Sequence, residues 1–297
     1  MNPPPTAATA LPVYSVRTHN ASALSENRMH SDEVAAQYGF KGALVPGVTV
    51  FSHMTQPLVA THGAAWLALG SADVTFAKPA YEGEILSVHA LRGDAADSYA
   101  VTCVNEQGVE LARMSAHLRR APGAVDARAA IEPAASPAEE SLGPVEAPGQ
   151  KPLGPVGAPV QKPLVTWDLM AVGKPFPALA WKPTQAENLE WCADVRDELT
   201  IYREGAAPLL HPGLVLRQAN LVLRNRFALP AWIHTGSRIT FHAVARAGEA
   251  FEVRAIPEEK WVRKGHEFVR LYVCILRDGG VVAEILHTAI FRPRKTG

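Results

Sequence analysis

The residue in this sequence best suited to acid–base chemistry is His30, which closes the segment SENRMH over residues 25–30. Ser31 follows it and can cap a short helix, with Asp32-Glu33 in the first turn complementing the helix dipole. Gly39 supplies the left-handed residue that ends such a helix. His30 would then stand just ahead of the helix, where its imidazole can turn into a cavity and titrate near neutral pH. The alternative is a hydrogen-bonded histidine that only fixes this loop.

Four neighbours of His30 bear on the same chemistry. Glu26 and Asp32 each carry a carboxylate that could pair with the imidazole. The Ser25 hydroxyl cannot act as a base near neutral pH, so we expect it either to position a water molecule or to serve as a turn residue. Asn27 is expected to brace the loop through hydrogen bonds from its side chain to the backbone.

An oxyanion-binding position is expected at Gly47, which follows Pro46 and opens a longer helical stretch. The first amides of a helix have no partner within it, and they suit a carbonyl oxygen that becomes negatively charged. Close helix packing would equally require a glycine there. The stretch is apolar on most sides, so we expect a buried helix. Within it, Pro57 predicts either a kink or a stop and restart.

The chain contains two similar units. Pro46-Gly47 and Pro212-Gly213 each precede an apolar stretch, and the two glycines lie 166 residues apart. Two further matches lie at an offset of 165: Val74-Thr75-Phe76 with Ile239-Thr240-Phe241, and Gly83-Glu84 with Gly248-Glu249. A nearly constant offset indicates duplication of one fold unit.

Each unit places one helix before segments that alternate between apolar and polar residues, the pattern of strands with one buried face. Examples are residues 86–90, 99–103 and 112–118 in the first unit and 251–255 and 285–289 in the second. Turn sequences such as Glu106-Gln107-Gly108 separate them, as hairpins require. The sequence therefore predicts an α+β fold in which an antiparallel sheet wraps a central helix, twice. The two units would pack as an internal pseudo-dimer, with strands continuing across the junction.

Residues 121–163 differ in composition from both flanks and are rich in Ala, Pro, Gly and Glu. They contain a tandem copy, LGPVEAPGQKP at 142–152 and LGPVGAPVQKP at 153–163. Proline at this density cannot join a sheet ladder or a helix interior, so we expect a disordered linker. The predicted boundaries are residues 1–120 for the first unit, 121–163 for the linker and 164–297 for the second unit.

The segment SENRMHSDEVAAQYGFKGALVPGVTVF, residues 25–51, resembles the hydratase signature of the MaoC-like (R)-specific enoyl-CoA hydratase/dehydratase family. That signature has an aspartate, an asparagine two residues on and a histidine three further on. A short helix, a Gly-Phe pair and a helix-opening glycine follow. Asn27, His30, Gly39-Phe40 and Gly47 fall at these positions, and Ser25 stands where the family has its aspartate. The resemblance implies a double hot-dog fold.

The resemblance also implies a reaction, the interconversion of 2-enoyl and 3-hydroxyacyl thioesters. The substrate would be a thioester of coenzyme A or of an acyl carrier protein, with no metal or redox cofactor. His30 would be the acid–base residue, Glu26 or Asp32 its carboxylate partner, and Gly47 an amide donor to the thioester oxygen. Loss of a positioned acid–base group costs about 10²–10⁴-fold in rate, so Ser25 makes the motif atypical. Two alternatives are a hot-dog acyl-CoA thioesterase and a non-catalytic acyl-thioester binding protein.

The second unit has no histidine at the position of His30, which implies one active site per chain. We expect His211, directly before Pro212-Gly213, to order that turn. Cations of the second unit form either an ion-paired edge, the simpler expectation, or a site for coenzyme A phosphates, and we assign none of them. They are Arg217, Arg224, Arg226, Arg263, Lys264 and Arg270.

Bulk composition narrows the expected partners. The 29 basic and 29 acidic residues balance, so net charge gives no reason to expect nucleic acid or an anionic membrane. Three widely spaced cysteines form neither a disulfide framework nor a zinc spacing, which favours the cytoplasm. We expect no secretory signal, and no stretch approaches the ~20 apolar residues of a membrane span. The expected partners are an acyl thioester and, as an option, a second copy of the chain in a homodimer.

Overall fold

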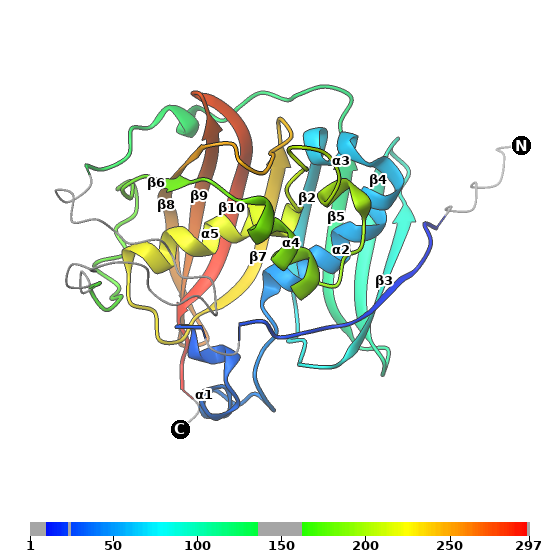
Figure 1. Cartoon of the computed structure of the whole chain (residues 1–297). Helices are drawn as coiled ribbons and strands as arrows, with labels where there is room; N and C mark the ends of the chain where they lie inside the picture. Colours follow the sequence, from blue (N-terminus) through cyan, green and yellow to red (C-terminus); the bar gives the residue numbers. More distant parts are fainter. Residues whose placement is uncertain (1–9, 23–24, 136–161, 296–297) are drawn as a thin grey trace, which may run out of the picture.

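The computed structural model describes residues 10–22, 25–135 and 162–295. In these residues one antiparallel ten-stranded sheet has the order β1-β3-β4-β5-β2-β7-β10-β9-β8-β6 (Figure 1). Its halves join where β2 pairs with β7, with Ala72 opposite Ile239. The predicted continuation of strands across the junction is confirmed, since the two expected sheets are the halves of one.

The strands divide between the two predicted units. The first half consists of β1 (Tyr14–Arg17), β2 (Gly70–Phe76), β3 (Ile85–Arg92), β4 (Ser98–Asn105) and β5 (Glu110–Leu118). The second half consists of β6 (Leu179–Trp181), β7 (Ile233–Phe241), β8 (Phe251–Arg263), β9 (His266–Arg277) and β10 (Gly280–Arg292).

A long helix lies against each half of the sheet, α2 (Gly47–His62) on the first and α5 (Pro212–Arg226) on the second (Figure 1). The predicted burial of α2 is confirmed, because most of its side chains are buried between the sheet and α5. The helix runs through Pro57 without a stop, which decides between the two alternatives that the sequence left open. No helix in the described ranges combines the length and the hydropathy that a bilayer crossing needs.

Shorter helices flank the two long helices. The 3₁₀ helix η1 (Arg28–His30) and α1 (Asp32–Gln37) precede α2, and α3 (Ala64–Leu69) follows it. Before α5 lie α4 (Gln185–Asp194) and η3 (Thr200–Tyr202). As predicted, Gly39 has a positive φ of 83° just after α1. Ser31 takes the cap position of α1, but its hydroxyl donates to the Arg28 carbonyl at 2.8 Å instead of capping a helix amide.

The duplication is visible in matching backbone hydrogen bonds. The Val45 amide donates to the Ala80 carbonyl at 2.9 Å, and the Leu210 amide donates to the Ala245 carbonyl at 2.8 Å. Both pairs lie at an offset of 165, whereas Gly47 and Gly213 lie at 166. The second unit therefore has one extra residue, His211, between this bond and its long helix.

The first part of the predicted linker, residues 121–135, lies against the second half of the sheet. It contains the 3₁₀ helix η2 (Ala127–Ala130), whose Ala129 packs on Tyr272 and Cys274 of β9. Arg128 forms ion pairs with Asp126, at 2.6 Å, and with Glu258. This placement differs from the disordered linker that composition predicted, because apolar and acidic side chains of β8 and β9 complement the segment. Residues 136–161, with almost all of the tandem copy, lie outside the described residues.

Candidate active site

His30 lies at the end of η1, and both nitrogens of its ring are hydrogen-bonded. Nδ1 lies 2.6 Å from the Leu44 carbonyl oxygen, which can only accept, so Nδ1 carries the proton. Nε2 then holds the lone pair and accepts from Asn27 Nδ2 at 3.1 Å. Burial lowers the pKa of His30; the bond to Leu44 opposes this effect and the Arg224 cation adds to it. The imidazole is therefore a neutral ring with Nε2 as its basic atom.

Asn27 is buried and joins the two halves of the molecule. Besides donating to His30, its Nδ2 donates to the Trp232 carbonyl at 3.1 Å. Its Oδ1 accepts from the amides of Trp232, at 3.2 Å, and Met29, at 3.3 Å. These four bonds use the full capacity of a side-chain amide. The prediction that Asn27 braces the loop is confirmed, and the braced backbone includes the residue just before β7.

Neither predicted carboxylate contacts the His30 ring. The Glu26 side chain is 60% exposed and pairs with Lys162 at 3.3 Å and with Arg224 at 4.0 Å. Asp32 instead accepts from the Ala43 amide at 2.7 Å and so closes the loop before α2. Within the described part of the chain, no carboxylate is hydrogen-bonded to His30, so the expected acid–histidine pair is not formed.

Ser25 acts as a turn residue, one of the two roles expected for it. Its Oγ donates to the Asn27 carbonyl oxygen at 3.3 Å. The hydroxyl therefore fixes the backbone that leads into η1.

The amino end of α2 is formed by Gly47, and no side chain caps it, because the preceding residue is Pro46. A Cβ atom on Gly47 would lie 3.0 Å from Nδ1 of His234 and 3.0 Å from a ring carbon of Phe76. These close approaches explain why a glycine stands here. In the described structure the amides of Gly47 and Val48 therefore have no acceptor, whereas Thr49 donates to the Pro46 carbonyl at 2.9 Å. The two free amides lie next to a buried histidine and a partly exposed phenylalanine.

A cluster of two histidines and a serine lies beside Gly47, and the sequence analysis missed it. Nε2 of His234 lies 2.8 Å from Ser237 Oγ, which lies 3.1 Å from Nδ1 of His287. All three residues are buried, on β7 and β10, and the two imidazole centroids are 4.3 Å apart. Nδ1 of His234 and Nε2 of His287 have no hydrogen-bond partner in the described structure. The cluster therefore ends on either side in a ring nitrogen that makes no hydrogen bond in the described structure.

The corresponding helix end in the second half is closed by His211. Its Nδ1 accepts from the Gly213 amide at 3.0 Å and from Trp191 Nε1 at 3.2 Å. Nε2 therefore carries the proton and faces Asp197 Oδ2 at 3.3 Å, with both side chains buried. The prediction that His211 orders its turn is confirmed. The acid–histidine pair expected at His30 thus occurs here instead, in a role that caps α5.

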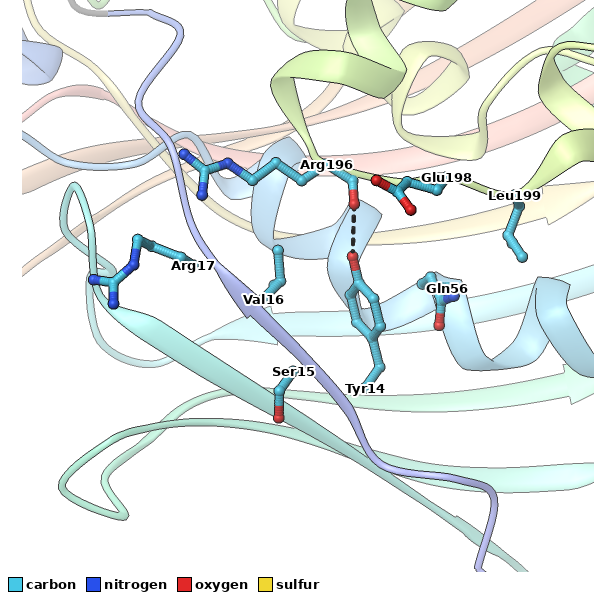
Figure 2. Close-up of a pocket in the computed structure, with 8 residues that line it drawn as sticks. All are labelled: Tyr14, Ser15, Val16, Arg17, Gln56, Arg196, Glu198 and Leu199. Carbon is cyan, nitrogen blue, oxygen red and sulfur yellow. Dashed lines mark hydrogen bonds between the residues drawn. The ribbon is translucent and has the colours of Figure 1, made fainter.

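A separate pocket of about 490 Å³ lies between β1, α2 and the loop after α4 (Figure 2). The Tyr14 hydroxyl donates to the Arg196 carbonyl across it, at 3.1 Å. The pocket is lined by Tyr14, Ser15, Val16, Arg17, Gln56, Arg196, Glu198 and Leu199. Neither His30 nor Gly47 belongs to this lining, so the pocket is not part of the site at the amino end of α2.

The cations considered for coenzyme A phosphates lie in two regions, α5 and the hairpin between β8 and β9. On α5, Arg217 lies over the Trp191 ring at 5.5 Å, and Arg224 is the cation that acts on His30. In the hairpin, Arg270 is ion-paired with Glu258 and Glu259, as expected for a charged edge. Arg224 is thus the one of the six whose charge reaches the candidate site.

Comparison with known proteins identifies the fold. No protein-family model and no curated protein matches the sequence. Among solved structures, a MaoC domain protein from Chloroflexus aurantiacus J-10-fl superposes with a TM-score of 0.64 at 15% identity, covering 98% of this chain and 96% of that one. A Mycobacterium tuberculosis protein with a double hotdog fold superposes with a TM-score of 0.60 at 15% identity, and the match covers 96% of both chains. A MaoC-like dehydratase superposes with a TM-score of 0.56 at 11% identity, and the match covers 94% of this chain and 97% of that one. The chain therefore has the double hot-dog fold of these MaoC-like proteins.

Proposed function

We propose that this protein binds an acyl thioester at the amino end of α2 and interconverts 2-enoyl and 3-hydroxyacyl thioesters. The observation that carries the proposal is the contrast between the two long helices. The amide of Gly213 is bonded to His211, whereas α2 has no side-chain cap at Gly47. His30 is fixed to the carbonyl of Leu44, three residues before that uncapped end.

The chemistry of hydration fits these groups. The thioester oxygen accepts from the first amides of α2, where the helix dipole also favours negative charge. Nε2 of His30 takes a proton from water as the water oxygen bonds to Cβ, and the π electrons move to form an enolate. His30 then returns this proton to Cα, which restores the carbonyl and the neutral ring. One base thus serves both proton transfers, and dehydration is the reverse.

Two side chains must change their contacts for this reaction to occur. Asn27 gives up its contact with His30 Nε2 to the attacking water, while its three bonds to backbone groups can persist. Phe76, partly exposed and packed against Gly47, turns aside to admit the thioester. The similar fold of a MaoC-like dehydratase supports the choice of reaction, and the motif around His30 supports its place.

A substrate panel tests the proposal. We expect the wild type to hydrate at least one 2-enoyl-CoA in a series of short, long and branched members, followed by loss of the enoyl absorbance. His30→Ala should lower kcat about 10²–10⁴-fold, the usual cost of removing an acid–base group. His62→Gln is the matched control, since His62 bonds Tyr99 at the other end of α2 and should leave turnover unchanged.

Other results of this panel would contradict the proposal. Wild-type inactivity on every member excludes the hydratase, and release of free thiol redirects the function to an acyl-CoA thioesterase. Binding of the thioesters without turnover would establish a non-catalytic binding protein. That second candidate is favoured by one observation, the lack of a carboxylate at the His30 ring in the described residues.

The cellular setting is part of the proposal. Cys103, Cys192 and Cys274 are buried free thiols, which fits the reducing cytoplasm that we propose for this protein. The homodimer remains a prediction.

A further inference from the structure

We infer that His234, which the second half contributes, is a catalytic residue of the site at the amino end of α2, where its Nδ1–H donates to the thioester oxygen beside the Gly47 amide. This inference rests on the proposed function and adds a residue that the MaoC-like motif does not contain. Ser237 and His287 act as positioning residues, because they fix the tautomer of the His234 ring.

The geometry around Gly47 supports the inference. Nδ1 of His234 lies 3.0 Å from the position of a Cβ on Gly47, so it faces the residue that opens the uncapped helix. The His234 side chain is 7% exposed, and its Nδ1 has no partner within the described structure. A buried polar atom without a partner is costly, and such an atom in a native structure calls for an explanation. A bound carbonyl oxygen would satisfy it.

When the Ser237 hydrogen lies on one of its two bonds to the rings, the cluster has two arrangements, because the hydroxyl has one hydrogen to share between them. In one arrangement Ser237 donates to His287, and the unpaired N–H is Nε2–H of His287, enclosed at 0% exposure. In the other arrangement His287 donates to Ser237 and Ser237 donates to His234. The unpaired N–H is then Nδ1–H of His234, beside Gly47. Only this second arrangement leaves its unpaired donor where a ligand can accept from it.

The charge state of the cluster also suits an oxyanion donor. Burial lowers the pKa of His234 well below its usual value and the nearby His287 ring lowers it further, while a backbone hydrogen bond with Gly236 opposes both effects. Burial likewise lowers the pKa of His287 to about 3. Both rings are therefore neutral near pH 7, and the cluster stabilises developing negative charge through a preorganised N–H dipole without placing a buried cation in the site.

Two substitutions at position 234 separate the donor role from a structural role. In His234→Asn the side-chain amide takes the place of Nδ1, so it keeps a donor toward Gly47 and loses the bond to Ser237. In His234→Gln the amide takes the place of Nε2, so it keeps the bond to Ser237 and loses the donor. We expect His234→Gln to lower kcat about 10²–10³-fold with a small change in KM, and His234→Asn to retain most of kcat. A higher kcat in His234→Gln than in His234→Asn would mean that His234 serves only to hold Ser237, and would overturn the inference.

A spectroscopic measurement tests the same bond without turnover. The infrared carbonyl stretch of a saturated acyl-CoA, labelled with ¹³C at the thioester carbonyl, should shift to lower frequency on binding to the wild type. The shift should be smaller in His234→Gln and largely kept in His234→Asn. An equal shift in all three proteins would overturn the inference.

The outcomes distinguish this inference from the proposed function. Loss of turnover in His30→Ala with full turnover in His234→Gln would leave the hydratase standing and remove His234 from it. A wild type that binds the acyl-CoA without turnover would remove the hydratase, and the carbonyl shift would still decide the role of His234. Failure to bind any acyl-CoA would overturn both. Where His234→Gln does not fold, Ser237→Ala replaces it, and unchanged kcat in that variant would overturn the inference.

Discussion

The Asn27 side chain shows how one residue can couple the two halves of the molecule. It is buried and bonded to the backbone of Trp232 in both directions. Truncation in Asn27→Ala would leave the Trp232 amide and carbonyl without these partners. We expect the free energy of unfolding to fall by about 3 kcal/mol, since each unsatisfied buried group costs about 1–3 kcal/mol. Urea unfolding measures this loss.

Ser25→Ala is the control for that prediction, because the Ser25 hydroxyl makes one bond of 3.3 Å in a part-buried position. Its loss should cost less than about 1 kcal/mol. Equal stability of Asn27→Ala and the wild type would mean that the two halves associate without this contact.

The sequence predicted some site residues and missed others for a physical reason. His30, Asn27 and Gly47 were found because their spacing is local and fits one loop and one helix start. The carboxylate partner was not found, since sequence proximity does not determine which way a side chain turns. Glu26 faces Lys162, at the end of the predicted linker, and Asp32 is bonded to the Ala43 amide. Long-range partners of this kind are decided by tertiary packing.

The cluster beside Gly47 was missed because of a defect in strand periodicity. His234 and Ser237 are three residues apart, and strict alternation would place them on opposite faces of β7. The pairing of β7 with β10 shifts between Gly236 and His234, so Thr235 is an extra residue in β7. Such a β-bulge re-aims side chains, and here it brings His234 and Ser237 within 2.8 Å of each other.

At the scale of elements, the cap of α5 is expected to be a major source of local stability. His211→Ala would leave the Gly213 amide, the Trp191 Nε1–H and the Asp197 carboxylate without their partner. Each of these buried groups costs about 1–3 kcal/mol when it is left unsatisfied, so we expect the free energy of unfolding to fall by at least about 3 kcal/mol. Thermal and urea unfolding of the variant provide the measurement.

The other helix provides the control for the cap. Pro46→Ser adds a side-chain acceptor at the uncapped end of α2, where a serine cap is worth about 1 kcal/mol in stability. This variant should therefore be no less stable than the wild type. If His211→Ala were also as stable as the wild type, the cap of α5 would not be a structural device.

At the scale of the whole molecule, the fold was more predictable than the site. Alternating apolar residues and the repeated Pro-Gly placed the strands and both long helices, because burial of one face dominates those patterns. The extra residue His211 was visible only as a change of offset from 165 to 166. Its consequence, a capped α5 beside an uncapped α2, needed the paired backbone bonds of the two units to be compared. One inserted residue thus makes two similar units chemically unequal.

Buried neutral histidines should also make the whole fold sensitive to acid. Burial lowers the pKa of His53 to about 3, with the nearby His211 and Arg196 lowering it further against the effect of Asp197. Burial lowers the pKa of His287 to about 3 as well. In the unfolded chain both rings titrate near the ordinary value of about 6.5. Below that pH the unfolded chain binds protons that the folded chain does not, so stability falls as pH falls.

The free energy of unfolding should fall by about 1.4 kcal/mol per pH unit for each such histidine. This decrease should continue from about pH 6.5 down toward pH 3. Urea unfolding at pH 7, 6 and 5 measures the slope. His53→Gln should reduce that slope by about 1.4 kcal/mol per pH unit, the contribution of one histidine, because glutamine does not titrate. Met54→Leu, a buried substitution at the next position of α2, should change stability without changing the slope. A slope in His53→Gln as steep as that of the wild type would mean that His53 is already protonated in the fold.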